Sequence, residues 1–125
     1  MCGIVGILGS MPVSQDLVSA LERLDYRGYD SAGIAVVNGT GLLRRRAVGR
    51  VENLKRLVEE SPVDGTIGIA HTRWATHGAP SERNAHPHQA GRVAVVHNGI
   101  IENHRLLRET LQEVGVEFRT ETDTE

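Results

Sequence analysis

Hydrophobic positions in the first half of the chain follow two patterns, short apolar runs and one-faced spacing. The runs are rich in β-branched residues and predict buried strands over residues 2–8, 32–37 and 42–48. Asn38-Gly39 predicts a hairpin turn between the last two strands. One-faced spacing predicts two helices, with apolar positions Leu17, Val18, Leu21 and Leu24 in the first and Val51, Leu54, Leu57 and Val58 in the second. Ser14 is the expected cap of the first helix, and Ser61-Pro62 ends the second.

The middle of the chain contains a long segment without periodicity. Residues 66–72 and 92–97 predict strands, whereas residues 73–91 between them are rich in His, Pro, Gly, Asn and Ser. We expect a long loop here. Loops of this length inside a compact domain more often carry function than not, so this segment is the first place to look for a site.

The C-terminal segment predicts a third helix and one more strand. The helix is capped by Asn103, ends at Gly115 and has four apolar residues that we expect to face inward, namely Leu106, Leu107, Leu111 and Val114. Residues 116–120 predict a short strand. Thr122-Asp123-Thr124-Glu125 is typical of the start of a helix, so we expect residues 1–125 to be part of a longer protein.

Composition and charge exclude several classes of protein. The 125 residues carry 14 basic and 16 acidic side chains, which argues against an electrostatic nucleic-acid binder. The single cysteine excludes an internal disulfide, and no apolar run approaches a membrane span. The N-terminus lacks the positive region of a signal peptide. We therefore expect a cytoplasmic protein that binds neither nucleic acid nor membrane.

Cys2 is the first candidate for chemistry. Removal of Met1 would leave a free α-amine beside the thiol, and α-amino groups have a pKa of about 7.7 to 8.0, close to working pH. A nucleophile that uses its own amine as base is a known arrangement. The alternative is that Cys2 is simply a small buried residue at the start of a strand.

Other candidates lie in and after the long loop. Arg73 suits two-pronged capture of a carboxylate or, alternatively, forms a surface salt bridge. Asn98-Gly99 follows a predicted strand and suits an oxyanion hole, or is only a turn. Five histidines lie within a short stretch, at positions 71, 77, 86, 88 and 97. Their spacing matches none of the usual zinc patterns, so we expect them to form hydrogen bonds in the loop.

Taken together, six segments are more specific than any one of them. In order along the chain they are Cys2–Gly6, Tyr26–Gly33, His71–Gly78, Asn84–His88, His97–Asn103 and Thr122–Glu125. These segments resemble the N-terminal, class II glutaminase domain of the glutamine:fructose-6-phosphate aminotransferases, also called glucosamine-6-phosphate synthases. The resemblance covers essentially the whole chain.

The resemblance implies an α+β fold, the four-layer αββα sandwich of N-terminal-nucleophile hydrolases, here truncated. It also implies that Cys2, freed from Met1, attacks the side-chain amide of glutamine. Asn98 and the N–H of Gly99 would stabilise the oxyanion, and Arg27 and Gly28 would lie near the nucleophile.

Substrate binding is implied for a second group of residues. Arg73 would hold the α-carboxylate of L-glutamine and Asp123 its α-ammonium. Trp74 to Gly78 would form a loop that closes over the site, with Thr76 and His77 at the substrate.

The resemblance implies no cofactor and no metal. In the full-length enzyme, sugar-isomerase domains absent from this chain would use the released ammonia to convert fructose 6-phosphate to glucosamine 6-phosphate, and the enzyme would form a homo-oligomer. Two alternatives stay open. One is the glutaminase domain of another class II amidotransferase, and the other is a glutamine-binding module without turnover.

Overall fold

A four-stranded antiparallel sheet forms the frame of the computed structural model, which describes residues 1–125. Its strands are β1 (Gly3–Leu8), β2 (Ser31–Asn38), β3 (Gly41–Val48) and β4 (Ile67–Arg73), in the spatial order β1-β4-β2-β3. The predicted strands and hairpin are confirmed, although the turn itself lies at Gly39 and Thr40, one residue later than expected.

The register of the central strand β4 brings the candidate residues of distant segments together. Gly3 pairs with Thr72 on one side of β4, and Ser31 pairs with Arg73 on the other. Cys2 therefore lies beside the end of β4, where the long loop begins. This pairing is a tertiary feature that spans some seventy residues of sequence.

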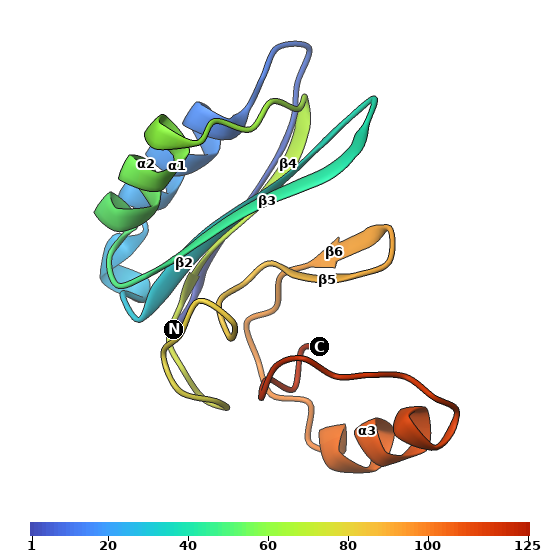
Figure 1. Cartoon of the computed structure of the whole chain (residues 1–125). Coiled ribbons are helices and arrows are strands. Elements are labelled where there is room, and N and C mark those ends of the chain that lie inside the picture. Colours follow the sequence, from blue (N-terminus) through green and yellow to red (C-terminus); the bar gives the residue numbers. More distant parts are fainter.

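Helices α1 (Ser14–Glu22) and α2 (Val51–Glu60) pack on one face of this sheet (Figure 1). Their predicted stripes supply six of the twelve residues of the buried core, and Leu17, Leu21 and Leu54 are completely buried. The other two stripe residues, Leu24 and Leu57, are only partly buried. Burial of one such side chain stabilises a fold by about 1.5–3 kcal/mol. Ser14 is the first residue of α1 rather than its cap, because Val13 occupies the cap position. A short 3₁₀ turn, η1 (Asp25–Arg27), leads from α1 into β2.

The β-hairpin of β5 (His88–Ala90) and β6 (Val93–Val95) lies on the opposite side of the sheet, and α3 (His104–Glu113) lies farthest from α1 and α2 (Figure 1). The layers thus follow the order helix, sheet, sheet, helix. β5 falls within the segment predicted as loop, which is a correction, and the strand predicted over 92–97 is shorter than expected. Pairing of His88 with Val95 explains both differences, because each strand exists only by bonding to the other.

Two predictions for the C-terminal segment are wrong. Val116 to Thr120 forms no strand, since no other strand pairs with it, and the Glu125 carboxylate instead accepts the N–H groups of Arg119 and Thr120 at 2.7 and 2.6 Å. The start of a helix at Thr122 stays a prediction, because the four residues from Thr122 to Glu125 are too few to form one; the Thr122 hydroxyl lies 3.1 Å from His88 Nε2. The apolar stripe of α3 does not face inward either. All four of its residues are exposed, Val114 by 76%.

Apolar side chains are also exposed on the sheet face that points away from α1 and α2. They include Ile4, Leu8, Val37 and Ile67. The β5–β6 hairpin and the loop before it cover only the part of this face near Arg44, Arg46 and His71. None of the helices is both long and apolar enough to cross a bilayer.

Candidate active site

Cys2 is nearly buried at the start of β1, with 9% of its surface exposed. Its Sγ accepts the N–H of Trp74 at 3.2 Å, and its own N–H points at Asn98 Oδ1, 3.5 Å away. Arg27 Nε donates to the Cys2 carbonyl at 3.2 Å. Cys2 is therefore held by contacts from three separate segments, one to its thiol and two to its backbone.

A pocket of about 260 Å³ opens beside this thiol. It is smaller than the roughly 300–1,000 Å³ of pockets for drug-sized ligands, so its size suits a small metabolite. The predicted site residues that line it are Cys2, Arg73, Trp74, Thr76, His77, Asn98, Gly99 and Asp123. Arg27 and Gly28 do not line it.

A glycine is nevertheless required at position 28 for a structural reason. A Cβ at this position would lie 2.7 Å from the backbone carbon of Arg73 and 3.0 Å from the nitrogen of Trp74. Only glycine lets the segment before β2 approach the end of β4 this closely. Gly28 thus helps to place the Trp74 N–H that contacts Cys2.

Arg73 organises the loop that follows it. Its buried guanidinium donates to the carbonyl oxygens of His77, Gly78 and Ala79, the last two at 3.0 and 3.2 Å. Burial lowers the pKa of Arg73 below its ordinary value, while the nearby carboxylate of Asp30 opposes this shift. The sequence did not identify Asp30, which accepts the N–H of Ala75 at 2.6 Å. Residues 74–79 therefore curl around a cation at the edge of the pocket.

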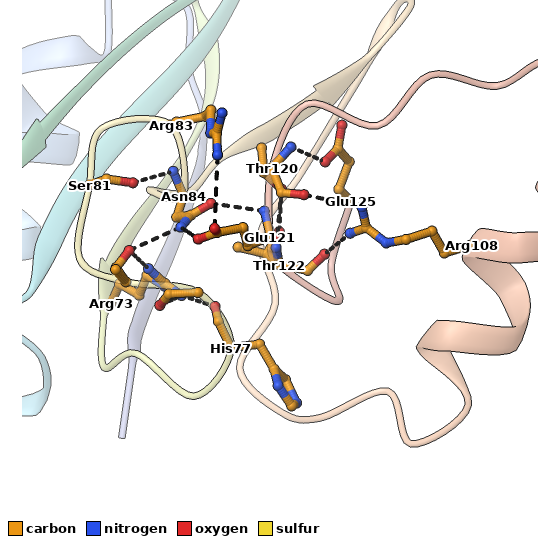
Figure 2. A network of polar contacts seen from close by, with 12 residues as sticks. Arg73, His77, Ser81, Arg83, Asn84, Arg108, Thr120, Glu121, Thr122 and Glu125 are labelled. Carbon is orange, nitrogen blue, oxygen red and sulfur yellow. Dashed lines mark hydrogen bonds and ion pairs between the residues drawn. The ribbon is translucent and has the colours of Figure 1, made fainter. Parts of the chain in front are cut away.

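Asp123 lies on the opposite wall of the pocket, where its Oδ2 accepts the N–H of Ile101 at 2.8 Å. Figure 2 shows how neighbouring residues tie this C-terminal segment to the loop after Arg73. Asn84 donates to Glu121 Oε2 at 2.9 Å and accepts the Glu121 N–H at 3.0 Å. Arg108 donates to the carbonyls of Thr120 and Thr122 at 3.2 and 3.1 Å. Neither Asn84 nor Arg108 was predicted as a site residue, because only the fold brings them to these partners.

Histidines form a buried cluster at the pocket, and one of them, His86, lines it. The rings of His71 and His86 stack with centroids 4.0 Å apart, and the His88 ring meets His86 edge-on at 4.5 Å. Their hydrogen bonds go to His97 and Thr122, as the prediction of loop hydrogen bonding requires. No group of three or more His, Cys, Asp or Glu side chains is arranged to hold a metal ion.

Burial makes these histidines hard to protonate. It lowers the pKa of His71 and His88 to about 4 and that of His86 to about 2, with neighbouring cations and imidazoles adding to the effect. All three are neutral at pH 7. His77 lies apart from this cluster, with its ring 4.8 Å from that of His104, and its Nε2 is buried without a hydrogen-bond partner although the residue lines the pocket.

Acidification from pH 7 to pH 5.5 is expected to lower the free energy of unfolding. Unfolded histidines titrate near 6.5, so the unfolded chain binds more protons than the fold as the pH falls from there toward 4. Stability is thus complete above about pH 6.5. Below it, each buried histidine costs up to about 1.4 kcal/mol per pH unit.

Urea unfolding curves at the two pH values check this, with pulsed hydrogen exchange of the β4 peptide as the readout of this region. His86→Asn, which cannot titrate, is the control and should reduce the pH dependence, with the contributions of His71 and His88 remaining. Equal curves for the wild-type protein at both pH values would contradict the assignment of buried neutral histidines.

Comparisons with known proteins agree with this geometry. A family model described as "Glutamine amidotransferase domain" matches residues 58–125, more than half of the chain. The chain is 65% identical to the glutamine–fructose-6-phosphate aminotransferase (isomerizing) of Rhizobium meliloti (strain 1021) over all of its 125 residues. It is 63% identical to the enzyme of the same name from Bradyrhizobium diazoefficiens. In both cases it spans only 21% of the relative's length.

Solved structures confirm the predicted fold. The glutamine phosphoribosylpyrophosphate amidotransferase from B. subtilis, complexed with ADP and GMP, superposes with a TM-score of 0.82 at 28% identity, over 99% of this chain and 27% of that one. A structure described as the allosteric regulatory enzyme of purine biosynthesis gives the same TM-score at 29% identity, over 99% of this chain and 28% of that one. The α+β fold with antiparallel sheets is that of N-terminal-nucleophile glutaminase domains. The chain belongs to the glutamine amidotransferase domain family.

Proposed function

We propose that this chain hydrolyses the side-chain amide of L-glutamine to glutamate and ammonia. The observation that carries the proposal is the buried Cys2 thiol at a small pocket whose walls also hold Asn98, a guanidinium and a carboxylate. Residues 1–125 are then part of the N-terminal glutaminase domain of a longer protein. In that protein the ammonia converts fructose 6-phosphate to glucosamine 6-phosphate in sugar-isomerase domains.

The chemistry begins with removal of Met1, which frees the amine of Cys2. This amine takes the proton from Sγ, and the sulfur attacks the amide carbon to form a tetrahedral oxyanion. The protonated amine then gives its proton to the leaving nitrogen. Ammonia departs, and the remaining acyl group forms a thioester with Cys2. A water molecule, deprotonated by the same amine, attacks the thioester and releases glutamate, which restores the thiol.

Asn98 and Gly99 are the proposed oxyanion donors. Because Asn98 Oδ1 faces the Cys2 nitrogen, its Nδ2 is left to donate to the developing charge. Gly99 adds its backbone N–H, and a Cβ at this position would lie 2.7 Å from His97 Nε2, so the His97 ring would have to move to accommodate one. Donors already in place at a forming charge need no reorganisation, and this is the source of their catalytic effect.

The two charged walls of the pocket suit the two charges of an amino acid. The Arg73 guanidinium matches the α-carboxylate and the free oxygen of Asp123 the α-ammonium. The buried, unpartnered Nε2 of His77 is a ready contact for the substrate. Trp74 and Thr76 belong to the loop that would cover the substrate. Arg27 binds the Cys2 carbonyl, and Gly28 allows the close approach that places the Trp74 N–H at the thiol.

Glutamate release, measured together with the intact mass of the active protein, tests this proposal. Full-length protein should release glutamate from glutamine without added metal, and its N-terminus should begin at Cys2. Glutamine binding without release would point instead to a non-catalytic module. Active protein that retains Met1 would exclude the amine as the base.

Recognition of the two substrate charges by Arg73 and Asp123 leads to a second prediction. Arg73→Lys should lower kcat/KM for glutamine by about ten-fold to more than a hundred-fold, because lysine loses the two-pronged contact. Arg73→Lys should also lower kcat/KM for des-amino glutamine, because this analogue keeps the carboxylate. Asp123→Asn should lower kcat/KM for glutamine only, since the analogue has no ammonium to lose.

Steady-state kinetics of both substrates with both variants provide the measurement, and exposed Asp64→Asn, outside the pocket, is the matched control. If Asp123→Asn weakened both substrates equally, Asp123 would not contact the ammonium.

The proposal includes a homo-oligomeric, cytoplasmic full-length enzyme. The single cysteine, which can form no internal disulfide, supports the cytoplasmic location, and the homo-oligomer rests on the resemblance to the aminotransferases. Size-exclusion chromatography with light scattering measures the oligomeric state.

A further inference from the structure

Both polar groups of the His97 backbone are held by imidazoles. His71 Nε2 lies 3.0 Å from the His97 carbonyl oxygen, and His86 Nδ1 lies 3.4 Å from the His97 nitrogen. His71 comes from β4 and His86 from the covering loop, yet their rings are stacked with an interplanar angle of 14°. The two stacked rings thus both hydrogen-bond to the backbone of His97, which directly precedes the proposed oxyanion donors Asn98 and Gly99.

The bonding pattern defines the protonation of both rings. A carbonyl only accepts, so His71 must donate from Nε2, and its buried Nδ1 is left without a partner. A backbone N–H only donates, so His86 must present a lone pair on Nδ1. Both requirements are met by neutral imidazoles, and burial keeps these two rings neutral at pH 7.

The side chain of His97 extends the same arrangement to the opposite wall. Its Nδ1 lies 3.2 Å from the hydroxyl of Thr124, next to Asp123. Its Nε2 occupies the space above Gly99 that a Cβ would need. A shift of His97 would therefore move the oxyanion donors and disturb the contact beside Asp123, the proposed partner of the substrate ammonium.

We propose that His71 and His86 are positioning residues for glutamine hydrolysis, which hold the His97 backbone so that Asn98 and the Gly99 N–H face the tetrahedral oxyanion. This inference rests on the proposed function. Neither ring touches the reacting atoms in this role. A misplacement of about 1 Å in a catalytic group can cost a hundred-fold in rate, so a grip on one residue has a measurable effect.

Paired substitutions separate positioning from packing. His86→Asn keeps an acceptor near the Nδ1 position and His71→Gln keeps a donor near the Nε2 position, whereas His86→Leu and His71→Leu fill similar space without either group. In full-length protein, the leucine variants should lower kcat for glutamine by about ten-fold to a hundred-fold with KM changed by less than about three-fold. The asparagine and glutamine variants should recover most of this loss.

Folding is controlled in two ways. The concentration of folded sites is first measured by complete alkylation of Cys2 with an electrophilic glutamine analogue. Each rate is then divided by this concentration, so unfolded protein is not counted. Val58→Ala, in the core between α2 and the sheet, lowers stability without touching the pocket and should leave kcat unchanged.

A double-mutant cycle with Asn98→Ala gives the decisive result. If His86 acts through the oxyanion donors, His86→Leu should cost much less kcat when Asn98 is already alanine. Fully additive losses, or equal losses for the leucine and asparagine variants, would overturn the positioning role while glutamine hydrolysis by Cys2 still stands. Wild-type protein that releases no glutamate would overturn the proposed function itself, and this inference with it.

Discussion

Cys2→Ala in the full-length protein is expected to lower glutamine hydrolysis by about 10⁴-fold or more, the scale on which loss of a nucleophile acts in covalent catalysis. Without Sγ no thioester forms, and the α-amine and oxyanion donors have no attack to assist. Alanine is as small as cysteine at this position, so processing of Met1 should continue. A coupled glutamate-release assay measures the loss.

Amination from free ammonia is the internal control for this variant. If the proposed sugar-isomerase domains lie outside this chain, formation of glucosamine 6-phosphate from fructose 6-phosphate and added ammonium should persist in Cys2→Ala. Cys2→Ser should behave similarly, because an alcohol is a much weaker nucleophile than a thiol near neutral pH. Normal glutaminase turnover in Cys2→Ala would place the nucleophile elsewhere.

Asn98→Ala is expected to lower kcat by about 10²- to 10³-fold, the cost found for loss of one oxyanion donor. KM should change little, because this contact strengthens only as charge develops on the amide oxygen. The side chain is exposed and buries no apolar surface, so the fold should be unaffected. Steady-state kinetics and an unfolding curve of the same sample separate the two effects.

Asn103→Ala is the matched control for this substitution. Asn103 is another exposed asparagine close in sequence, it does not line the pocket, and its side chain caps nothing at the start of α3. Its kcat should equal that of the wild-type protein. An Asn98→Ala variant with higher KM and unchanged kcat would show that Asn98 binds the ground state rather than the oxyanion.

Local patterns were sufficient for the elements whose partners are near in sequence or whose stripe meets a core. The β2–β3 hairpin follows from two apolar runs around a short turn, and α2 from one apolar stripe that is buried as predicted. Gly115 ends α3 with a φ of 90°, a conformation that glycine adopts without strain. The glutamine amidotransferase family could also be identified from short segments, because a site needs particular side chains at particular positions.

Long-range contacts decided the rest. Apolar spacing alone cannot tell whether a stripe finds a partner, so Leu106 and Leu111 of α3 are exposed although their pattern matches that of buried leucines. Residues 116–120 have strand-like composition but no neighbouring strand, and a strand exists only through bonds to another.

The site shows the same division. From the sequence we predicted the chemistry of Cys2, Arg73 and Asn98, whereas only the register of β1 on β4 put the thiol beside the loop after Arg73. The stacking of His71 on His86 likewise joins a strand to a loop. Sequence determines which groups are available, and the tertiary structure determines which of them meet, because hydrogen bonds and ring contacts act only over a few ångströms.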